Sequence, residues 1–74
     1  MKIKFWNKLV DRARTKKDGV WSYQNVVYAV KNGNIGYYAE GGKIFQVQGM
    51  FSVEIGKCNL FDYKKEITKL YNRS

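Results

Sequence analysis

Apolar residues at the start of the chain recur with the period of a helix. Between Ile3 and Ala13 they fall within an arc of about 160° at 3.6 residues per turn, and the charged residues face away. The pattern predicts an amphipathic N-terminal helix. This helix should end between Thr15 and Gly19, where the period is lost and glycine supplies a turn signal.

The middle of the chain alternates apolar and polar positions between three turns that contain glycine. Asn32-Gly33 and Gly41-Gly42 suit two-residue turns with positive φ, and Gly49-Met50 places glycine first, as a type II′ turn requires. These turns predict an antiparallel meander of four strands, over residues 21–31, 34–40, 43–48 and 51–55.

Turns of two residues would also set the register of the strands. Tyr28 should face Tyr37, Tyr37 should face Gln46, and Gln46 should face Val53. One face of the sheet is then almost wholly apolar. We expect its residues to be buried: Tyr28, Val30, Ile35, Tyr37, Ile44, Phe51 and Val53.

A second helix is predicted after the sheet. Asn59 is a suitable N-cap with Asp62 three residues later, and apolar residues then share one side of a helix that runs to about Asn72. The fold class is therefore α+β, a single domain over residues 1–74 with element order α-β-β-β-β-α. The simplest burial packs both terminal helices on the one apolar face. A competing interpretation makes residues 22–31 a helix that Gly33 would end.

The second face of the predicted sheet carries aromatic residues. Trp21 and Tyr23 lie on it, and Tyr38 stands directly opposite Phe45. Large apolar side chains on a solvent face mark an interface, so this pair is the expected anchor of a partner. Such a face could also stack nucleic-acid bases. Alternatively, a bulge near Gln24 and Asn25 would return Trp21 and Tyr23 to the core, or one terminal helix would cover the face.

The chain is strongly basic. It has 14 Lys and Arg against 6 Asp and Glu, a net charge of +8, and half of its cations lie in the first 17 residues. Such a block can contact phosphates or an acidic protein surface. The candidate cations are five residues of the N-terminal block and two of the sheet: Lys8, Arg12, Arg14, Lys16, Lys17, Lys31 and Lys43.

The residue types needed for catalysis are scarce. The chain has no His and one Cys, so neither a zinc site nor a nucleophile paired with a histidine can form. Glu40 and Glu54 should lie two strands apart, roughly 10 Å, which is too far to share a proton. Cys58 fits best as a small residue at a helix entrance. We therefore expect no catalytic, metal or cofactor site and no small-molecule substrate.

Cysteine content and hydropathy bear on location. Cys58 has no partner for an intramolecular disulfide, which favours a reducing cytoplasm, and nowhere do about 18 apolar residues run together. The apolar side of the first helix is needed to cover the sheet. A membrane partner is therefore not expected.

Two resemblances bear on the partner. Eleven Lys against three Arg, with six Asn, six Tyr and no Pro, is typical of AT-rich codons and resembles small host-takeover proteins of bacteriophages. Residues 46–51, Gln-Val-Gln-Gly-Met-Phe, are similar to the peptide by which bacterial proteins dock on the replicative sliding clamp, with Gly49 inserted. These resemblances imply a module that blocks or redirects a host protein of replication or transcription. Direct nucleic-acid binding is the alternative.

Overall fold

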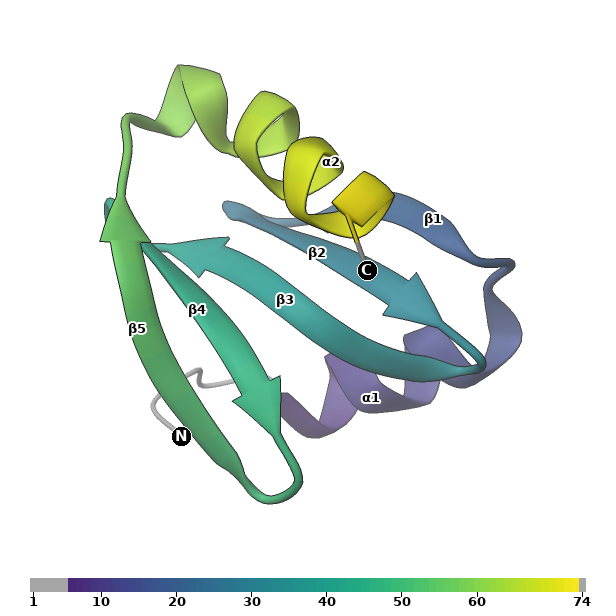
Figure 1. Ribbon diagram of the computed structural model, residues 1–74. Helices are drawn as coiled ribbons and strands as arrows, with labels where there is room; N and C mark the ends of the chain where they lie inside the picture. The colour runs from purple at the N-terminus through teal and green to yellow at the C-terminus, as the bar shows by residue number, and fades with distance from the viewer. Residues whose placement is uncertain (1–5, 74) are drawn as a thin grey trace.

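The N-terminal apolar stripe forms helix α1, Trp6–Thr15, in the computed structural model, which describes residues 6–73 (Figure 1). Leu9 and Ala13 are completely buried beneath it, as the helical period predicts. The helix ends where the sequence indicates. The part of the predicted helix before Trp6 lies outside the described residues.

Five antiparallel strands follow in a meander, each paired with the strand before it. The prediction of an antiparallel α+β meander is confirmed. The strands are β1 (Gly19–Tyr23), β2 (Val26–Lys31), β3 (Asn34–Glu40), β4 (Lys43–Gln48) and β5 (Phe51–Lys57), and helix α2 (Tyr63–Arg73) ends the chain.

The predicted strand over residues 21–31 is two strands. A turn at Gln24 and Asn25 divides it, and Tyr23 pairs with Val26 across that turn. Gln24 adopts a φ of 55°, in the left-handed region that glycine favours, although the turn contains no glycine. The element order is therefore α-β-β-β-β-β-α, and the helical interpretation of residues 22–31 is wrong.

The three turns predicted from glycine are confirmed. Asn32 and Gly33 have φ of 54° and 77°, and Gly41 and Gly42 have 60° and 81°, as type I′ turns require. At the third turn Gly49 alone has positive φ, at 62°, which fits type II′. Two contacts hold the Gly41-Gly42 turn: its Gly42 N–H donates to the Tyr63 hydroxyl, and its carbonyl accepts from Cys58.

The register is confirmed over part of the sheet. Tyr38 faces Phe45, Tyr37 faces Gln46, and Gln46 faces Val53. Between β2 and β3, however, Tyr28 faces Tyr38 rather than Tyr37. Gly36 is an extra residue there, so the pairing shifts by one position. A second shift at Ile55 pairs Ile44 with Gly56.

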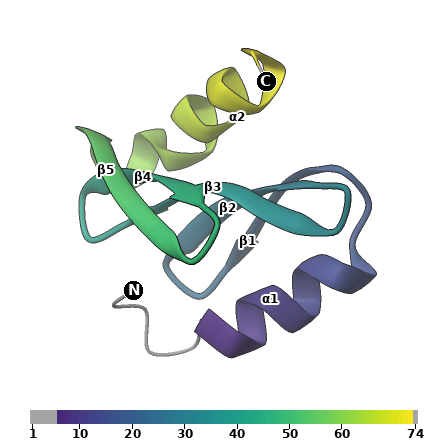
Figure 2. The ribbon, with the colours of Figure 1, turned by 60° about the horizontal axis from the view of Figure 1, so that its bottom comes forward.

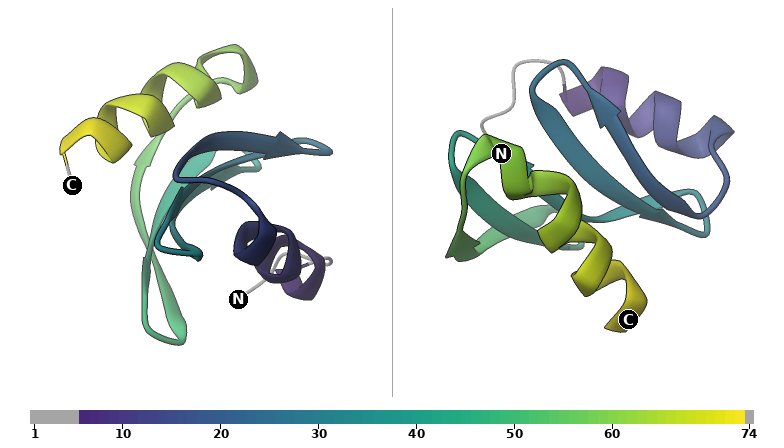
Figure 3. Two further views of the ribbon diagram at one scale, coloured as in Figure 1. Left: turned by 90° about the vertical axis from the view of Figure 1, so that its right-hand side faces the viewer. Right: turned by 90° about the horizontal axis from the view of Figure 1, so that it is seen from above.

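The two helices pack on opposite faces of the sheet, not on one face as expected (Figures 2 and 3). Helix α1 covers the face that carries Tyr28, Val30 and Tyr38. Helix α2 covers the face of Ala29, Ala39 and Ile44. Both faces of β2 and β3 carry apolar residues that need a cover, and the shift at Gly36 places Tyr38 on the side of Tyr28.

Burial follows these two layers. Of the residues expected in the core, Tyr28, Val30, Ile35 and Ile44 are buried and Tyr37 is half-buried. Phe51 and Val53 are exposed, so their expected burial is wrong. They lie on β5, beyond β1, β2 and β3, the strands on which α2 mainly packs.

The start of the C-terminal helix also differs from the prediction. Asn59 makes no capping hydrogen bond through its side chain, and a turn of 3-10 helix, η1 (Leu60–Asp62), precedes α2. Leu60 is exposed and not on the buried side of α2, because it belongs to this separate turn. Tyr63 and Ile67 are buried against the sheet, as the helical period predicts.

Two isoleucines of the β4–β5 hairpin test the layered core. Replacing buried Ile44 by Ala should lower the free energy of unfolding by about 2–5 kcal/mol, because it leaves a cavity beside Tyr63 and Ile67. Replacing the more exposed Ile55 by Ala should cost about 1 kcal/mol or less. Urea unfolding measures both, and equal losses would contradict the placement of the two residues.

The left-handed turn residue offers a second test. Gln24→Gly should raise the free energy of unfolding by about 0.5–1 kcal/mol, because glycine adopts positive φ without a steric cost. Asn25→Gly is the control: Asn25 has no positive φ, so the change should only loosen the unfolded chain and lower stability. A Gln24→Gly variant that is less stable than the parent would contradict the turn geometry.

Candidate docking surface

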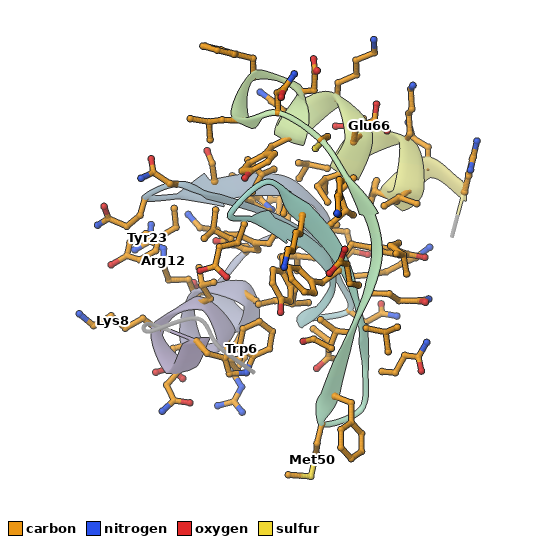
Figure 4. All side chains as sticks on the ribbon, turned by 90° about the vertical axis from the view of Figure 1, so that its left-hand side faces the viewer. Trp6, Lys8, Arg12, Tyr23, Met50 and Glu66 are labelled. Atoms are coloured by element: carbon orange, nitrogen blue, oxygen red, sulfur yellow. The ribbon has the colours of Figure 1, made fainter. Side chains whose placement is uncertain are left out.

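The β4–β5 hairpin exposes a row of large apolar side chains. Met50 is 90% exposed and Phe51 75% exposed, and Val53 and Ile55 are each more than a third exposed. We call these four residues the hairpin surface. Met50 stands at the far tip of the hairpin, at the end opposite α2 (Figure 4).

Three members of the hairpin surface lie on one side of β5. Phe51 pairs with Gln48, and Val53 pairs with Gln46. The other residues of β4 between and beside these glutamines, Phe45 and Val47, turn toward α1. Phe51 and Val53 therefore face the side of α2, and Ile55 lines a groove with α2 residues. Because α2 packs mainly over β1 to β3 and reaches Ile44 of β4, it leaves Phe51 and Val53 on this side of β5 exposed.

A groove of about 280 Å³ continues the hairpin surface toward α2. Its apolar wall is made by Ile44, Ile55 and Leu70. Its charged residues are three cations and one acid, Lys57, Lys69, Arg73 and Glu66, and Glu66 contacts Lys69 at 3.5 Å. The groove is thus apolar in its wall and positive at its rim.

The aromatic pair predicted as the partner anchor is a core feature instead. Tyr38 and Phe45 do stack across the strands, with ring centroids 4.8 Å apart. Tyr38 is only 2% exposed, however, because Trp6 of α1 lies over it with centroids 5.5 Å apart. Burial raises the pKa of Tyr38, which a hydrogen bond with Ser52 partly offsets. The expected exposed anchor is therefore wrong, and a helix covers the face.

Trp21 and Tyr23 lie beside this pair, as predicted, and are half-buried against α1. The Trp21 indole N–H donates to the Lys17 carbonyl at 2.9 Å, and the Lys16 ammonium lies 4.8 Å from the Trp21 ring centroid. The Arg12 guanidinium lies 4.6 Å from the centroid of Tyr23. These contacts make the two rings part of the attachment of α1 and not an open stacking platform.

Three candidate cations form a row along α1. Lys8 and Arg12 lie one turn apart on one side of α1 (Figure 4), and Lys16 follows four residues later, just after the helix ends at Thr15. We call them the basic row. Arg12 and Lys16 reach the aromatic rings of β1, and Lys8 extends the row beside Tyr23.

The other candidate cations are dispersed. Arg14 lies 3.8 Å from Asp11 on α1. Lys43 bridges to Glu54 on β5 at 3.8 Å. Lys31 lies over Tyr71 of α2 at 5.9 Å, so it and Lys43 occupy opposite sides of the sheet. The register shift at Gly36 separates them.

Groups that could carry chemistry do not converge in residues 6–73. No set of three His, Cys, Asp or Glu residues lies close enough there to hold a metal ion. Lys43 contacts Glu54 and pairs in register with Glu40, so a cation stands between the two carboxylates. Burial raises the pKa of the Cys58 thiol, and the carboxylates of Glu66 and Asp62 raise it further. A higher pKa leaves less thiolate, which is the opposite of what an activated nucleophile needs.

Neither helix of the described chain has the length and apolar character needed to cross a bilayer. No protein-family model matches the chain, and neither a curated protein nor a solved structure matches it.

Sequence reasoning missed most of the hairpin surface and the groove cations. It placed Phe51 and Val53 in the core and assigned no role to Lys57, Lys69 or Arg73. One signal was available: β5 is the last strand of a meander and must lie at an edge, where one short helix does not reach.

The raised pKa of Cys58 gives a chemical prediction. Alkylation by iodoacetamide should be several-fold slower in the folded protein than in urea at pH 8.5, and its pH profile should have a higher midpoint. Because the folded pKa is above the unfolded pKa, the thiol stabilises the fold below the unfolded pKa, and this contribution is lost as pH rises through the folded pKa.

Charge removal supplies the control for Cys58. Glu66→Gln should speed alkylation by about twofold, because it removes a carboxylate that raises the pKa. Glu40→Gln removes the same charge from β3 and should leave the rate unchanged. Equal effects of the two variants would contradict the local cause.

Proposed function

We propose that this protein is a non-catalytic docking module that binds another protein through the hairpin surface. The observation that carries the proposal is the exposure of Met50 and Phe51 at the hairpin tip. Met and Phe are enriched at protein interfaces, and buried aromatic anchors supply most of the binding energy there. A small domain that leaves such residues in solvent has a surface suited to a partner.

The partner we favour is a host protein of replication or transcription, which the module would block or redirect. The phage-like composition supports this class. The free thiol of Cys58 fits a partner in a reducing cytoplasm. The sliding clamp is a specific candidate, because the two large residues of its docking peptide correspond to Met50 and Phe51. Gln46 is paired with Tyr37 and Val53, so only the hairpin tip would enter a clamp pocket while the sheet stays intact.

Nucleic-acid binding is the second candidate, and the basic row favours it. Lys8 and Arg12 on α1, with Lys16 just after its end, could contact consecutive phosphates. The rings that would stack bases are already used: Tyr23 and Trp21 hold these cations, and Tyr38 is buried. This candidate therefore rests on charge alone and requires a steep dependence on salt.

A capture experiment with matched variants tests the proposal. The protein is immobilised and exposed to nuclease-treated bacterial lysate, and a captured protein is then purified and titrated; a purified bacterial sliding clamp is titrated in parallel. Met50→Ser with Phe51→Ser should weaken binding by at least about 2 kcal/mol, roughly 30-fold, because apolar anchors are lost. The loss should persist at high salt, since apolar burial is not screened.

Two controls separate the candidates. Leu60→Ser with Phe61→Ser removes equally large exposed residues from η1, where Phe61 is 95% exposed, and should leave binding unchanged. Lys8→Glu with Arg12→Glu reverses the basic row and should have only a modest effect at physiological salt. If that reversal alone abolishes binding, or if a partner is captured only from lysate without nuclease, nucleic acid is the partner and the docking proposal fails.

A further inference from the structure

Within residues 6–73, no strand pairs with the outer edge of β5. β5 spans seven residues, about 23 Å of extended chain, and pairs with β4 on one side only. In a hairpin closed by a two-residue turn, the pair next to the turn is hydrogen-bonded, and here it is Gln48 and Phe51. From there, non-hydrogen-bonded and hydrogen-bonded pairs alternate along the two strands. Glu54 and Phe45 form a non-hydrogen-bonded pair, so the backbone N–H and C=O of Glu54 point away from β4. An extended peptide can be added as a further strand at such an edge.

The side chains beside this edge would receive alternate residues of an added strand. Phe51, Val53 and Ile55 are exposed on the same side of β5. A neighbouring strand would place every second side chain on this side, next to these three residues. Toward Ile55 the apolar strip deepens into the groove formed with Ile44 and Leu70.

The positive charge of the groove indicates the kind of peptide that the edge of β5 binds. The groove carries Lys57, Lys69 and Arg73 against Glu66 alone, and the whole chain has a net charge of +8. A second copy would bring the same excess of cations to the interface, and like charges disfavour such pairing. An acidic segment of another protein is complementary to the groove.

We propose that β5 binds an extended acidic peptide segment of the partner as a sixth, antiparallel strand. Alternate apolar residues of the peptide pack against Phe51, Val53 and Ile55, and its carboxylates contact Lys57, Lys69 and Arg73. The cations lie at the C-terminal end of β5, so an antiparallel peptide carries its acidic residues before its apolar ones. This inference rests on the proposed docking function and names the chemistry of the partner.

Synthetic peptides test the sequence order. The probe is a fluorescein-labelled nonapeptide of three glutamates followed by alternating valine and threonine, measured by fluorescence anisotropy with the full chain. It should bind at least tenfold more tightly than the peptide in reversed order and than one with lysines in place of the glutamates. It should also lose binding when the backbone nitrogens that face β5 are methylated. Equal binding of all four peptides overturns the proposal.

Variants of the protein test the two parts of the site. Lys69→Glu with Arg73→Glu should weaken probe binding at least tenfold, whereas Lys64→Glu with Lys65→Glu, the same charge change at the other end of α2, should weaken it less than threefold. Lys64 lines a different surface, beside β1. Equal losses from the two double variants would mean general charge attraction and would overturn the assigned groove.

The backbone edge has its own matched pair. Glu54→Pro removes the outward N–H and should abolish binding, and Glu54→Thr removes the same charge but keeps the N–H and should bind at least as well as the parent. Circular dichroism verifies the fold of each variant. If the proline variant does not fold, the methylated peptide decides the same question, because it blocks the same hydrogen bonds from the other side.

Other occupants give different results. Sedimentation that detects a dimer which Glu54→Thr preserves and Glu54→Pro dissociates would assign the edge to a second copy and overturn the proposal. Competition by a single-stranded oligonucleotide that also depends on Lys69 and Arg73 would assign the groove to nucleic acid. If a captured partner depends on Met50 and Phe51 but binds the Glu54→Pro variant normally, the docking function stands and the strand-addition proposal fails.

Discussion

In the part of the chain that the structure describes, two short helices must cover both faces of a five-stranded sheet, and their limited reach determines which surface stays open. A helix is about 10 Å across and strands are about 4.8 Å apart, so one helix shields two or three strands and not all five. Helix α1 shields the aromatic face, and α2 shields the first three strands on the other side. The α2 side of β5 has no cover left, and Phe51, Val53 and Ile55 are exposed there.

The turns and much of the register could be predicted because glycine marks them. Asn32-Gly33, Gly41-Gly42 and Gly49-Met50 each adopt the conformation that their composition indicates, and the β3–β4 pairing follows from the second turn. The turn at Gln24 could not be predicted in this way, because glutamine rarely adopts a positive φ and its presence does not indicate a turn.

The wrong assignment of residues to the two faces of the sheet has one physical origin. An extra residue in a strand exchanges inward and outward positions for everything beyond it. Gly36 is such a residue, and it moves Tyr38 onto the side of Tyr28. Both faces are apolar, and each takes one helix. The basic row was visible in the sequence because helical spacing is local, whereas the exposure of Val53 and Ile55 depends on how far α2 reaches across the sheet.

The sequential order of the strands has a consequence for how quickly the molecule assembles. Each strand is joined to its neighbour by a turn of two residues, so the contacts within the sheet connect residues that are close along the chain. Such hairpins form in about 1–10 µs, and closing them costs little loop entropy. The contact of α2 with β1 instead joins segments near opposite ends of the chain. We therefore expect this docking to be the late and entropically costly step, with the sheet and α1 already in place to receive it.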